Sequence, residues 1–508
     1  MKKVCLLFLA LSSIVNAMAQ YEQKFQTILP KHSWLEDIMP FHNGALATGE
    51  INGEATVVQL DSLGRTVWAD SSLNHPLSHG LRLISNSQSN IHLLGDFEAS
   101  NGVNDIYCRQ YDESKKLQWE AIYDSPIGTF NPDKFSDAAL DQNNNLFIAG
   151  NGKALGSGNK ALLLKYDSTG KLVADTLLSQ RFGNGKYVGI EVLSNRVMAT
   201  FYSQFGGTLT TQLHAYDLDL NPLWEFDLPY TVLFHHSSLA TNPSAYSAVA
   251  GRKFSNLKEA LIIFRPNGDT VKNVEMSLDG HSVLYGSKVL MDDTRFIYVL
   301  SNYNAVQMLS KYDTTGHLHW ADTLSRRLDG IVQNSQVFHL WKDRIICSSF
   351  YKDAQLHIFD TSGAKLHQLP IHLPGYTDPK VASITTDTHG GVWVCGAALD
   401  STSLTSKHAF AVYFEKQNPA DTLDPTSTNY GAHNASANLI ACYPNPTNRY
   451  LELGKEYSNV CIYDAQGQKV WQLRAAARLD VTALPKGLYY VTGNDEEGKY
   501  RKAQFVKR

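Results

Sequence analysis

The chain is poor in cysteine, in basic charge and in long apolar runs, and each shortage excludes a class of protein. Six widely spaced cysteines in 508 residues, without a CxxC pair, exclude a disulfide scaffold and a thiolate zinc site. After the first twenty residues no run is apolar enough for a membrane helix, which takes about 20 residues. A formal charge of −4 argues against general nucleic-acid binding, which needs a basic face.

The sequence also lacks the short motifs of common catalytic sites. It contains no HExxH motif and no P-loop, and "GHSVLYG" (280–286) has Leu284 where a GxSxG elbow needs glycine. The pair His235 and His236 is a poor metal site, since adjacent residues of a strand point to opposite faces and could share an ion only if the pair lay in a loop. We therefore predict no catalytic residue, no metal site and no cofactor.

The first residues, "MKKVCLLFLALSSIVNAMAQ", have the layout of a secretory signal. Lys2 and Lys3 form the basic end, Val4–Leu11 the apolar run, and Ala17-Met18-Ala19 the small-residue motif at the cleavage site. We expect residues 1–19 to be a signal peptide. Its removal leaves 43 basic against 49 acidic side chains, a charge of about −6.

Five cysteines remain in the mature chain. Cys347 and Cys395 lie within apolar runs, so we predict buried thiols there, and Cys108 is the third in the repetitive part. Cys442 and Cys461 either pair with each other or stay free; the sequence leaves both open.

A short motif recurs along the chain: an Asp after an aromatic or apolar residue, a polar turn that often closes on Gly, and then a Trp. Copies are "QLDSLGRTVWAD" (59–70), "QYDESKKLQWEA" (110–121), "KYDSTGKLVADT" (165–176), "AYDLDLNPLWEF" (215–226), "KYDTTGHLHWADT" (311–323) and "IFDTSGAKLHQL" (358–369). Their Asp residues are 51, 55, 50, 96 and 47 residues apart. A period near 50 indicates a repeat architecture.

Each unit divides into four short segments rich in Val, Ile, Phe, Tyr and Trp, bounded by Asn, Asp, Gly and Ser, which is typical of strands. Runs such as "ALLL" and "FAVYF" are apolar at successive positions, so both faces of these strands must be covered. Four-stranded sheets repeated radially are the blades of a β-propeller. We predict an all-β, eight-bladed propeller, or a seven-bladed one if the diverged unit around "LIIFRPNGDTV" is only a connection.

The repeat also assigns roles to its own residues. The Asp and Gly should form the tight turn between the third and fourth strands, and the Trp should pack against the next blade. The last unit has no fourth strand of its own, while "YEQKFQTIL" (21–29) is a strand without a unit. We predict that this segment completes the last blade and removes its open edge.

Two families share pieces of this repeat. "AALDQNNNLFIAG" (138–150) and "SITTDTHGGVWVCG" (383–396) resemble repeats of bacterial surface propellers of the SBBP type. "KYDTTGHLHW" is similar to the repeat of pyrroloquinoline-quinone propellers and their cofactor-free relatives in outer-membrane assembly. The adjacent cysteines often found under that quinone are missing here, so the resemblance implies a fold and no cofactor.

The tail carries a more specific resemblance. "YPNPT" (443–447), "VCIYDAQGQKV" (460–470), "LDVTALPKGLYYV" (479–491) and the terminal "KAQFVKR" resemble, in this order, the C-terminal sorting domain of the type nine secretion system of Bacteroidetes. The resemblance implies a small antiparallel sandwich, recognition by the outer-membrane translocon, and a secreted or cell-surface location. Its motif residues here are Tyr443, Pro444, Asn445, Pro446, Gly487 and Tyr489.

We thus expect a signal peptide (1–19), a propeller (20–418), a linker (419–438) and a sorting domain (439–508). Propellers usually bind ligands on one face, where loops between blades meet, and aromatic and imidazole groups suit a glycan or a peptide. The candidates are His32, His79, Arg181, Phe182, Tyr230, His235, His281 and Tyr376.

The predicted function is an exported binding or scaffold module. The alternative is an extracellular glycan hydrolase or lyase. A hydrolase would need two carboxylates about 5–9.5 Å apart; the loops offer Asp133, Asp279, Asp329 and Asp378.

Overall fold

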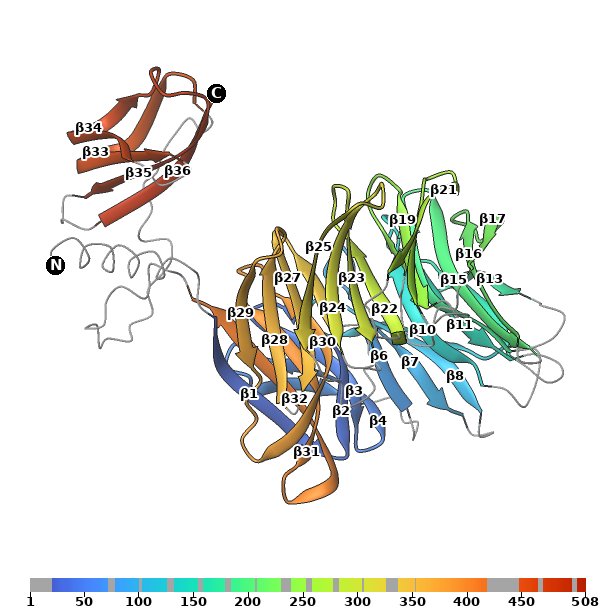
Figure 1. The fold of residues 1–508 in the computed structure, drawn as a ribbon. Helices are drawn as coiled ribbons and strands as arrows, with labels where there is room; N and C mark the ends of the chain where they lie inside the picture. Colours follow the sequence, from blue (N-terminus) through green and yellow to red (C-terminus); the bar gives the residue numbers. More distant parts are fainter. Residues whose placement is uncertain are drawn as a thin grey trace, which may run out of the picture. The chain divides into compact units, whose positions relative to one another are not determined.

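The computed structural model describes residues 21–71, 78–99, 103–125, 132–153, 159–178, 184–205, 208–229, 239–252, 258–276, 283–303, 306–325, 337–351, 353–417, 447–464, 469–495 and 500–508. The chain divides into two compact units, 1–423 and 424–508, which are treated separately (Figure 1). Every regular element in the described part is a β-strand. The all-β prediction is confirmed.

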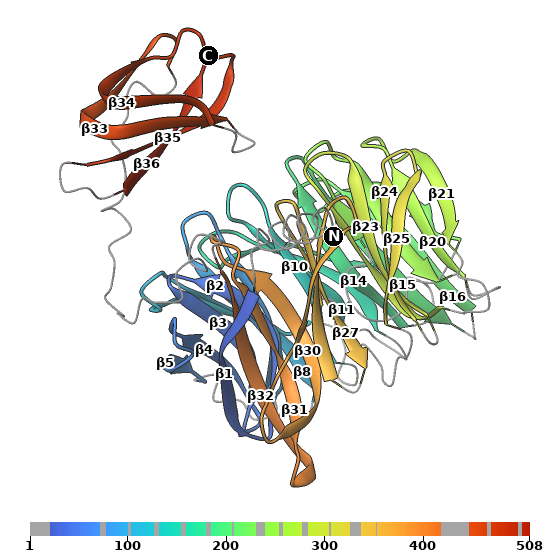
Figure 2. The same ribbon diagram turned by 60° about the vertical axis from the view of Figure 1, so that its left-hand side comes forward.

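The first unit is built from four-stranded antiparallel sheets that follow one another along the chain (Figures 1 and 2). Sheet 1 contains β2 (Ser33–Phe41), β3 (Gly44–Ile51), β4 (Glu54–Leu60) and β5 (Thr66–Asp70). Sheet 2 contains β6 (Ser78–Ser85), β7 (Ile91–Glu98), β8 (Asn104–Tyr111) and β9 (Leu117–Tyr123). Sheet 3 contains β10 (Lys134–Leu140), β11 (Leu146–Gly152), β12 (Lys160–Tyr166) and β13 (Leu172–Leu178). Sheet 4 contains β14 (Asn184–Leu193), β15 (Arg196–Phe205), β16 (Thr208–Tyr216) and β17 (Pro222–Asp227).

The second half repeats the pattern. Sheet 5, the diverged unit, contains β18 (Leu239–Thr241), β19 (Ser247–Arg252), β20 (Glu259–Phe264) and β21 (Thr270–Met276). Sheet 6 contains β22 (Val283–Met291), β23 (Phe296–Tyr303), β24 (Gln307–Asp313) and β25 (Leu318–Ser325). Sheet 7 contains β26 (Phe338–Trp341), β27 (Arg344–Tyr351), β28 (Asp353–Asp360) and β29 (Lys365–Pro370). Sheet 8 contains β30 (Tyr376–Thr386), β31 (Val392–Asp400), β32 (Ser403–Lys416) and β1 (Tyr21–Lys31).

Strand β1 closes the structure. It pairs antiparallel with β32, from Tyr21 opposite Lys416 to Lys31 opposite His408. The predicted completion of the last sheet by the N-terminal segment is therefore confirmed. The pairing covers the edge of β32, which would otherwise present free N–H and C=O groups.

Neighbouring sheets pack face to face through apolar side chains. The second strands are buried along nearly their whole length, as in β3 and β11, because a sheet covers each face. Leu35, Ala47 and Val58 of sheet 1 share a core with Trp393 and Cys395 of sheet 8. The last sheet therefore packs on the first, as a propeller requires.

The recurrent Asp forms the turn between third and fourth strands, as predicted. In sheet 3 the Oδ1 of Asp167 accepts hydrogen bonds from the backbone N–H of Thr169 (2.9 Å) and of Lys171 (3.1 Å). The N–H of Gly170, with φ at 84°, donates to the Asp167 carbonyl. Hydrogen bonds from Thr169 and Lys171 lower the pKa of Asp167. Turns of sheets 1, 6 and 7 have the same geometry at Asp61, Asp313 and Asp360.

The glycine has a second role that the sequence did not suggest. A Cβ on Gly170 would lie 2.5 Å from the Trp119 ring of the preceding sheet, and one on Gly363 would lie 2.8 Å from Trp320. Trp119 also stacks on Tyr166, with ring centroids 6.5 Å apart. The predicted packing of the Trp on the next blade is confirmed, although these rings are partly exposed rather than buried.

Between sheets 3 and 4 both residues of this Trp–Gly contact are replaced, the Trp by a small residue and the Gly by a large one. Ala174 stands in sheet 3 where Trp119 stands in sheet 2, and Leu220, with φ at 63°, replaces the turn glycine in sheet 4. Leu220 is 5% exposed and packs with Ala174 and Leu178. A large ring over glycine and a small residue under leucine fill the same space.

The C-terminal unit has four described strands in the order β34–β33–β35–β36. They are β33 (Tyr450–Asp464), β34 (Lys469–Asp480), β35 (Gly487–Asn494) and β36 (Tyr500–Lys507). Among these residues they form one sheet rather than the predicted two-sheet sandwich. The long β33 causes this, because it pairs with β34 along its length and with β35 in its second half.

We expect deletion of residues 21–31 to destabilise the first unit and make it aggregate. Tyr21 and Leu29 are buried, and each large buried apolar side chain contributes about 1.5–3 kcal/mol. Thermal unfolding and light scattering measure the effect. Adding the peptide YEQKFQTILPK in trans should restore the monomer, whereas a scrambled peptide should not. Equal stability of the deleted chain would contradict the role of β1.

We expect Gly170→Leu to destabilise the chain by about 2–4 kcal/mol, from overpacking against Trp119 and from a side chain at positive φ. Trp119→Ala alone should also destabilise it. The double variant reproduces the natural Ala174–Leu220 pair, so the two changes should offset each other by at least about 1 kcal/mol. Denaturant unfolding of the four proteins gives this coupling, and strictly additive losses would refute the proposed packing.

Candidate functional site

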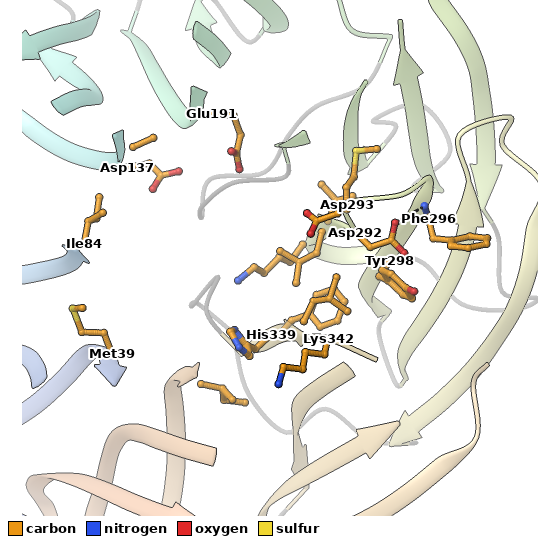
Figure 3. Close-up of a pocket in the computed structure, with 18 of the residues that line it drawn as sticks. Met39, Ile84, Asp137, Glu191, Asp292, Asp293, Phe296, Tyr298, His339 and Lys342 are labelled. Carbon is orange, nitrogen blue, oxygen red and sulfur yellow. Dashed lines mark hydrogen bonds between the residues drawn. The ribbon is translucent and has the colours of Figure 1, made fainter. Parts of the chain in front are cut away.

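A cavity of about 1070 Å³ lies among the first strands of the sheets (Figure 3). Its described lining comes from the second halves of β2, β6, β10, β14 and β22, from β26 and β30, from β23 and β24, and from the turns after β22, β26 and β28. Apolar lining residues include Met39, Ile84, Leu290 and Phe338, and charged ones include Arg82, Asp137, Glu191 and Lys288. The cavity is therefore the centre of the propeller.

A β-bulge in most of the first strands directs charged residues to this centre. The pairing register shifts just before Asp37, Arg82 and Asp137 in sheets 1, 2 and 3, and just before Lys288 in sheet 6. A bulge adds one residue and turns the following side chain to the other face. Of these, Arg82, Asp137 and Lys288 line the cavity, at positions that simple alternation would assign to the sheet interfaces.

Hydrogen bonds link these positions from sheet to sheet. Ser383 of sheet 8 donates to Asp37 Oδ1 (2.8 Å), and Asp37 Oδ2 accepts from the N–H of Leu83 in sheet 2 (2.9 Å). An Arg82 Nη2 atom lies 4.0 Å from Asp137 Oδ1, and Asp137 Oδ2 accepts from the N–H of Ile190 in sheet 4 (3.3 Å). Both aspartates are therefore held in place and serve the structure of the ring.

Glu191 and Lys288 are held less firmly. No carboxylate of the described residues lies within ion-pair distance of Lys288, and Glu191 forms a hydrogen bond with Thr241. Burial raises the pKa of Glu191 to about 8, with a further contribution from Asp137. Burial and the nearby Arg82 lower the pKa of Lys288 to about 7. Strongly shifted groups in a cavity mark a candidate functional site.

Sheets 6 and 7 form the side of the cavity away from Asp137 and Glu191 (Figure 3). Lys311 Nζ lies 3.7 Å from the centre of the Phe296 ring and donates to the Thr361 carbonyl (2.8 Å). The buried Tyr298 hydroxyl lies near Asp292, and burial, with this carboxylate, raises the pKa of Tyr298. His339 Nε2 lies 3.0 Å from Thr386 Oγ1, and burial lowers the pKa of His339 to about 4. This side combines aromatic faces with polar groups.

Three of the loop residues predicted to bind ligand are described: His32, His79 and Tyr376. None of them lines the cavity. They lie at or before the starts of β2, β6 and β30, whereas the cavity uses the later parts of the first strands. Arg181, Phe182, Tyr230, His235 and His281 lie outside the described residues.

His79 belongs to a small cluster at that end of the propeller. Its Nδ1 lies 2.8 Å from Glu50 Oε2, and its ring stacks on Trp34 with centroids 6.2 Å apart. Burial raises the pKa of Glu50, and the neighbouring His79 offsets part of this shift. Asp96 lies near as well, with its pKa raised by burial.

The other two are less connected. Tyr376 lies edge-on to His408 at 5.2 Å. His32 is exposed at φ 56°, and its N–H donates to the Lys407 carbonyl (2.9 Å). Of the three described loop candidates, His79 is thus the one that lies in a cluster of polar and aromatic side chains. The loop site itself stays a prediction.

The loop carboxylates proposed for a hydrolase do not form a pair where they are described. Asp133 is fully buried and binds the hydroxyl and N–H of Ser125. With Asp105 and Asp124 it surrounds the Lys153 ammonium, which lies 2.7 Å from Asp105 and 2.5 Å from Asp124. The lysine supplies the positive charge that a metal ion would bring. Asp378 is exposed, and Asp279 and Asp329 lie outside the described residues.

In the C-terminal unit, Gly487 begins β35 and Tyr489 anchors the turn before it. The Tyr489 hydroxyl donates to the Pro485 carbonyl (3.0 Å), and its ring stacks on Phe505 at 5.6 Å. Residues 443–446 lie outside the described part, as does Cys442. Cys461 is a buried free thiol, and so are Cys108, Cys347 and Cys395, as predicted for the last two.

Solved structures similar to the chain include propeller proteins, but at low similarity. The propeller domain of the Trilobed protease from Pyrococcus furiosus, with an open velcro topology, has 11% identity and a TM-score of 0.39, covering 79% of this chain and 100% of its own. A quinoprotein alcohol dehydrogenase-like protein from Bacteroides thetaiotaomicron has 10% identity and a TM-score of 0.39, with coverages of 67% and 75%. Polysaccharide lyase Uly1 has 7% identity and a TM-score of 0.41, with coverages of 75% and 90%. These similarities are too low to assign an activity.

No curated protein matches the chain significantly. No helix among the described residues is long and apolar enough to span a membrane. Residues 441–507 match the model of the secretion system C-terminal sorting domain. This part of the chain is therefore a type IX sorting domain, as predicted from its motifs, and it directs the protein to the cell surface or the extracellular space.

Proposed function

We propose that the protein is an exported binding module whose ligand occupies the central cavity of its propeller. The observation that supports this most is the cavity itself: about 1070 Å³, lined by apolar side chains and by charged groups that their neighbours do not fully satisfy. Ligand sites are typically concave and mostly apolar, with a few placed polar groups. The sorting domain brings this cavity to the outside of the cell, where a glycan or a peptide is available.

We also infer that the ring has eight blades. Each of the eight described sheets of the first unit has four strands, and the diverged fifth unit has a complete sheet, β18–β21, rather than a connection. In this assignment residues 1–19 are a signal peptide, 20–418 the propeller, 419–438 a linker and 439–508 the sorting domain. The loop residues around His79 form a second predicted contact surface.

We expect the 20–418 fragment to bind members of a glycan and peptide array, and Ala139→Trp to reduce this binding at least tenfold. Ala139 lines the cavity, so an indole there would fill it. Ala69→Trp, on the exposed outer strand β5, is the matched control. Full binding by Ala139→Trp together with loss in His79→Ala would place the site on the loops instead, and no binding to any array member would contradict the proposal.

A propeller-based glycan hydrolase is the second candidate, and one observation favours it. Asp137 and Glu191 lie on the same side of the cavity (Figure 3), and burial raises the pKa of both carboxyls, that of Glu191 to about 8. A carboxylic acid that stays protonated at neutral pH can serve as the general acid of glycoside hydrolysis, with a second carboxylate as base or nucleophile. In this mechanism Glu191 is the acid.

If a bound glycan is hydrolysed, we expect turnover to fall as the pH rises through about 8, because Glu191 then loses its proton. Glu191→Gln should lower turnover about 100-fold or more, the usual range for loss of a general acid. Glu259→Gln is a matched control, since burial raises the pKa of Glu259 to about 8 as well but it does not line the cavity. Release of reducing ends, measured from pH 5 to about 9, tests this. Equal loss in both variants would argue against it.

A further inference from the structure

Lys288 differs from the other lysines of the cavity in having no ion-pair partner in the part of the chain that the structure describes. Lys311 donates to a backbone carbonyl and lies over an aromatic ring, and Lys342 lies over the Trp341 ring at 4.5 Å. Lys288 follows the bulge in β22, which turns its side chain into the cavity. Within the described residues no carboxylate reaches its ammonium.

Four charged groups of other first strands act on Lys288: Asp37 of β2, Arg82 of β6, Asp137 of β10 and Glu191 of β14. His339 of β26 also lies near but is neutral at pH 7, and Asp292 and Asp293 in the turn after β22 line the same cavity. Asp37 and Asp137 are already bound by hydrogen bonds or by Arg82, so they compensate Lys288 only from a distance. Arg82 carries the same charge as a protonated Lys288 and opposes it.

We propose that Lys288 is a nucleophilic amine that forms a reversible imine with a carbonyl compound entering the cavity. An amine that is desolvated and lies near another cation is uncharged in a large fraction of molecules at neutral pH, and this is how reactive lysines are produced in proteins. The structure provides the conditions: a cavity wide enough for a small ligand, an unpaired ammonium, and a guanidinium nearby. The pKa of Lys288, lowered to about 7, agrees with these conditions.

The chemistry is balanced without an oxidant or a metal. The Nζ lone pair of Lys288 attacks the carbonyl carbon, and the nitrogen proton moves to the oxygen to give a carbinolamine. Loss of water then forms the C=N bond. Glu191, largely protonated at neutral pH, can protonate the leaving hydroxyl and take the proton back on hydrolysis.

The ligand class follows from Arg82. Among the described residues its buried Nε atom has no hydrogen-bond partner, and the ion pair found there for it, with Asp137, is long at 4.0 Å. A guanidinium with free donors suits a carboxylate. We therefore infer an aldehyde or ketone that also carries a carboxylate, such as a 2-oxo acid or the open-chain form of a sugar acid.

The test treats the full-length protein with glyoxylate and cyanoborohydride, which reduces the imine to a stable secondary amine, and maps modified lysines by peptide mass spectrometry. At pH 7 we expect Lys288 to react at least about tenfold faster than the median lysine, because about half of it is free amine, against less than about 0.1% for a lysine with a pKa near 10.4. Lys311 is an internal control from the same cavity. The midpoint of the pH–rate profile for Lys288 should lie near 7.

Two variants separate reactivity from simple exposure. Arg82→Gln removes the opposing charge, so the midpoint should move to higher pH and labelling at pH 7 should slow. Glu191→Gln should slow imine formation with glyoxylate while leaving direct acylation by acetic anhydride unchanged. Labelling of Lys288 at the rate of surface lysines, or a midpoint above about 9, would overturn the proposal. These results do not depend on any array ligand, so this inference can fail while the binding function stands.

Discussion

The pairing of β1 with β32 is the interaction on which the other features depend. A propeller has a centre only if its first and last sheets meet, and here two segments nearly 400 residues apart in sequence complete one sheet. Without this pairing the sheets could spread apart, the interface of sheets 8 and 1 around Trp393 would open, and the cavity would lose its enclosure. Loop-closure entropy opposes such a contact, but it grows slowly with chain length. The apolar side chains of β1 offset it.

The structural part of the repeat could be predicted from sequence because each of its residues acts locally. Asp167 forms a turn with residues two and four positions ahead, so the motif identifies the turn in any context. The role of Trp119 was predictable because its position recurs in other units. The exchange of Trp and Gly for Ala174 and Leu220 was not, since it appears only when residues of two sheets are compared in space.

The cavity was missed for a physical reason. Alternation along a strand assigns Asp137 or Lys288 to a sheet face, and only the bulge before each one turns it to the centre. Bulges depend on pairing with the neighbouring strand, which one sequence does not display. One signal was available: charged residues such as Arg82 in "LRLIS" and Glu191 in "GIEVL" interrupt otherwise apolar first strands. A charge at that place needs a polar neighbour or a solvent-filled space.

The position of β32 has a consequence for the order of events during synthesis and export. The ring cannot be finished until residue 416 exists, and the sorting domain lies beyond that point in the chain, at residues 441–507. A polypeptide released before β32 is made lacks both the partner of β1 and the export address. Every molecule that presents the sorting domain to the translocon therefore also contains all the strands of the ring. Export through this domain is thus limited to chains that are long enough to close the propeller.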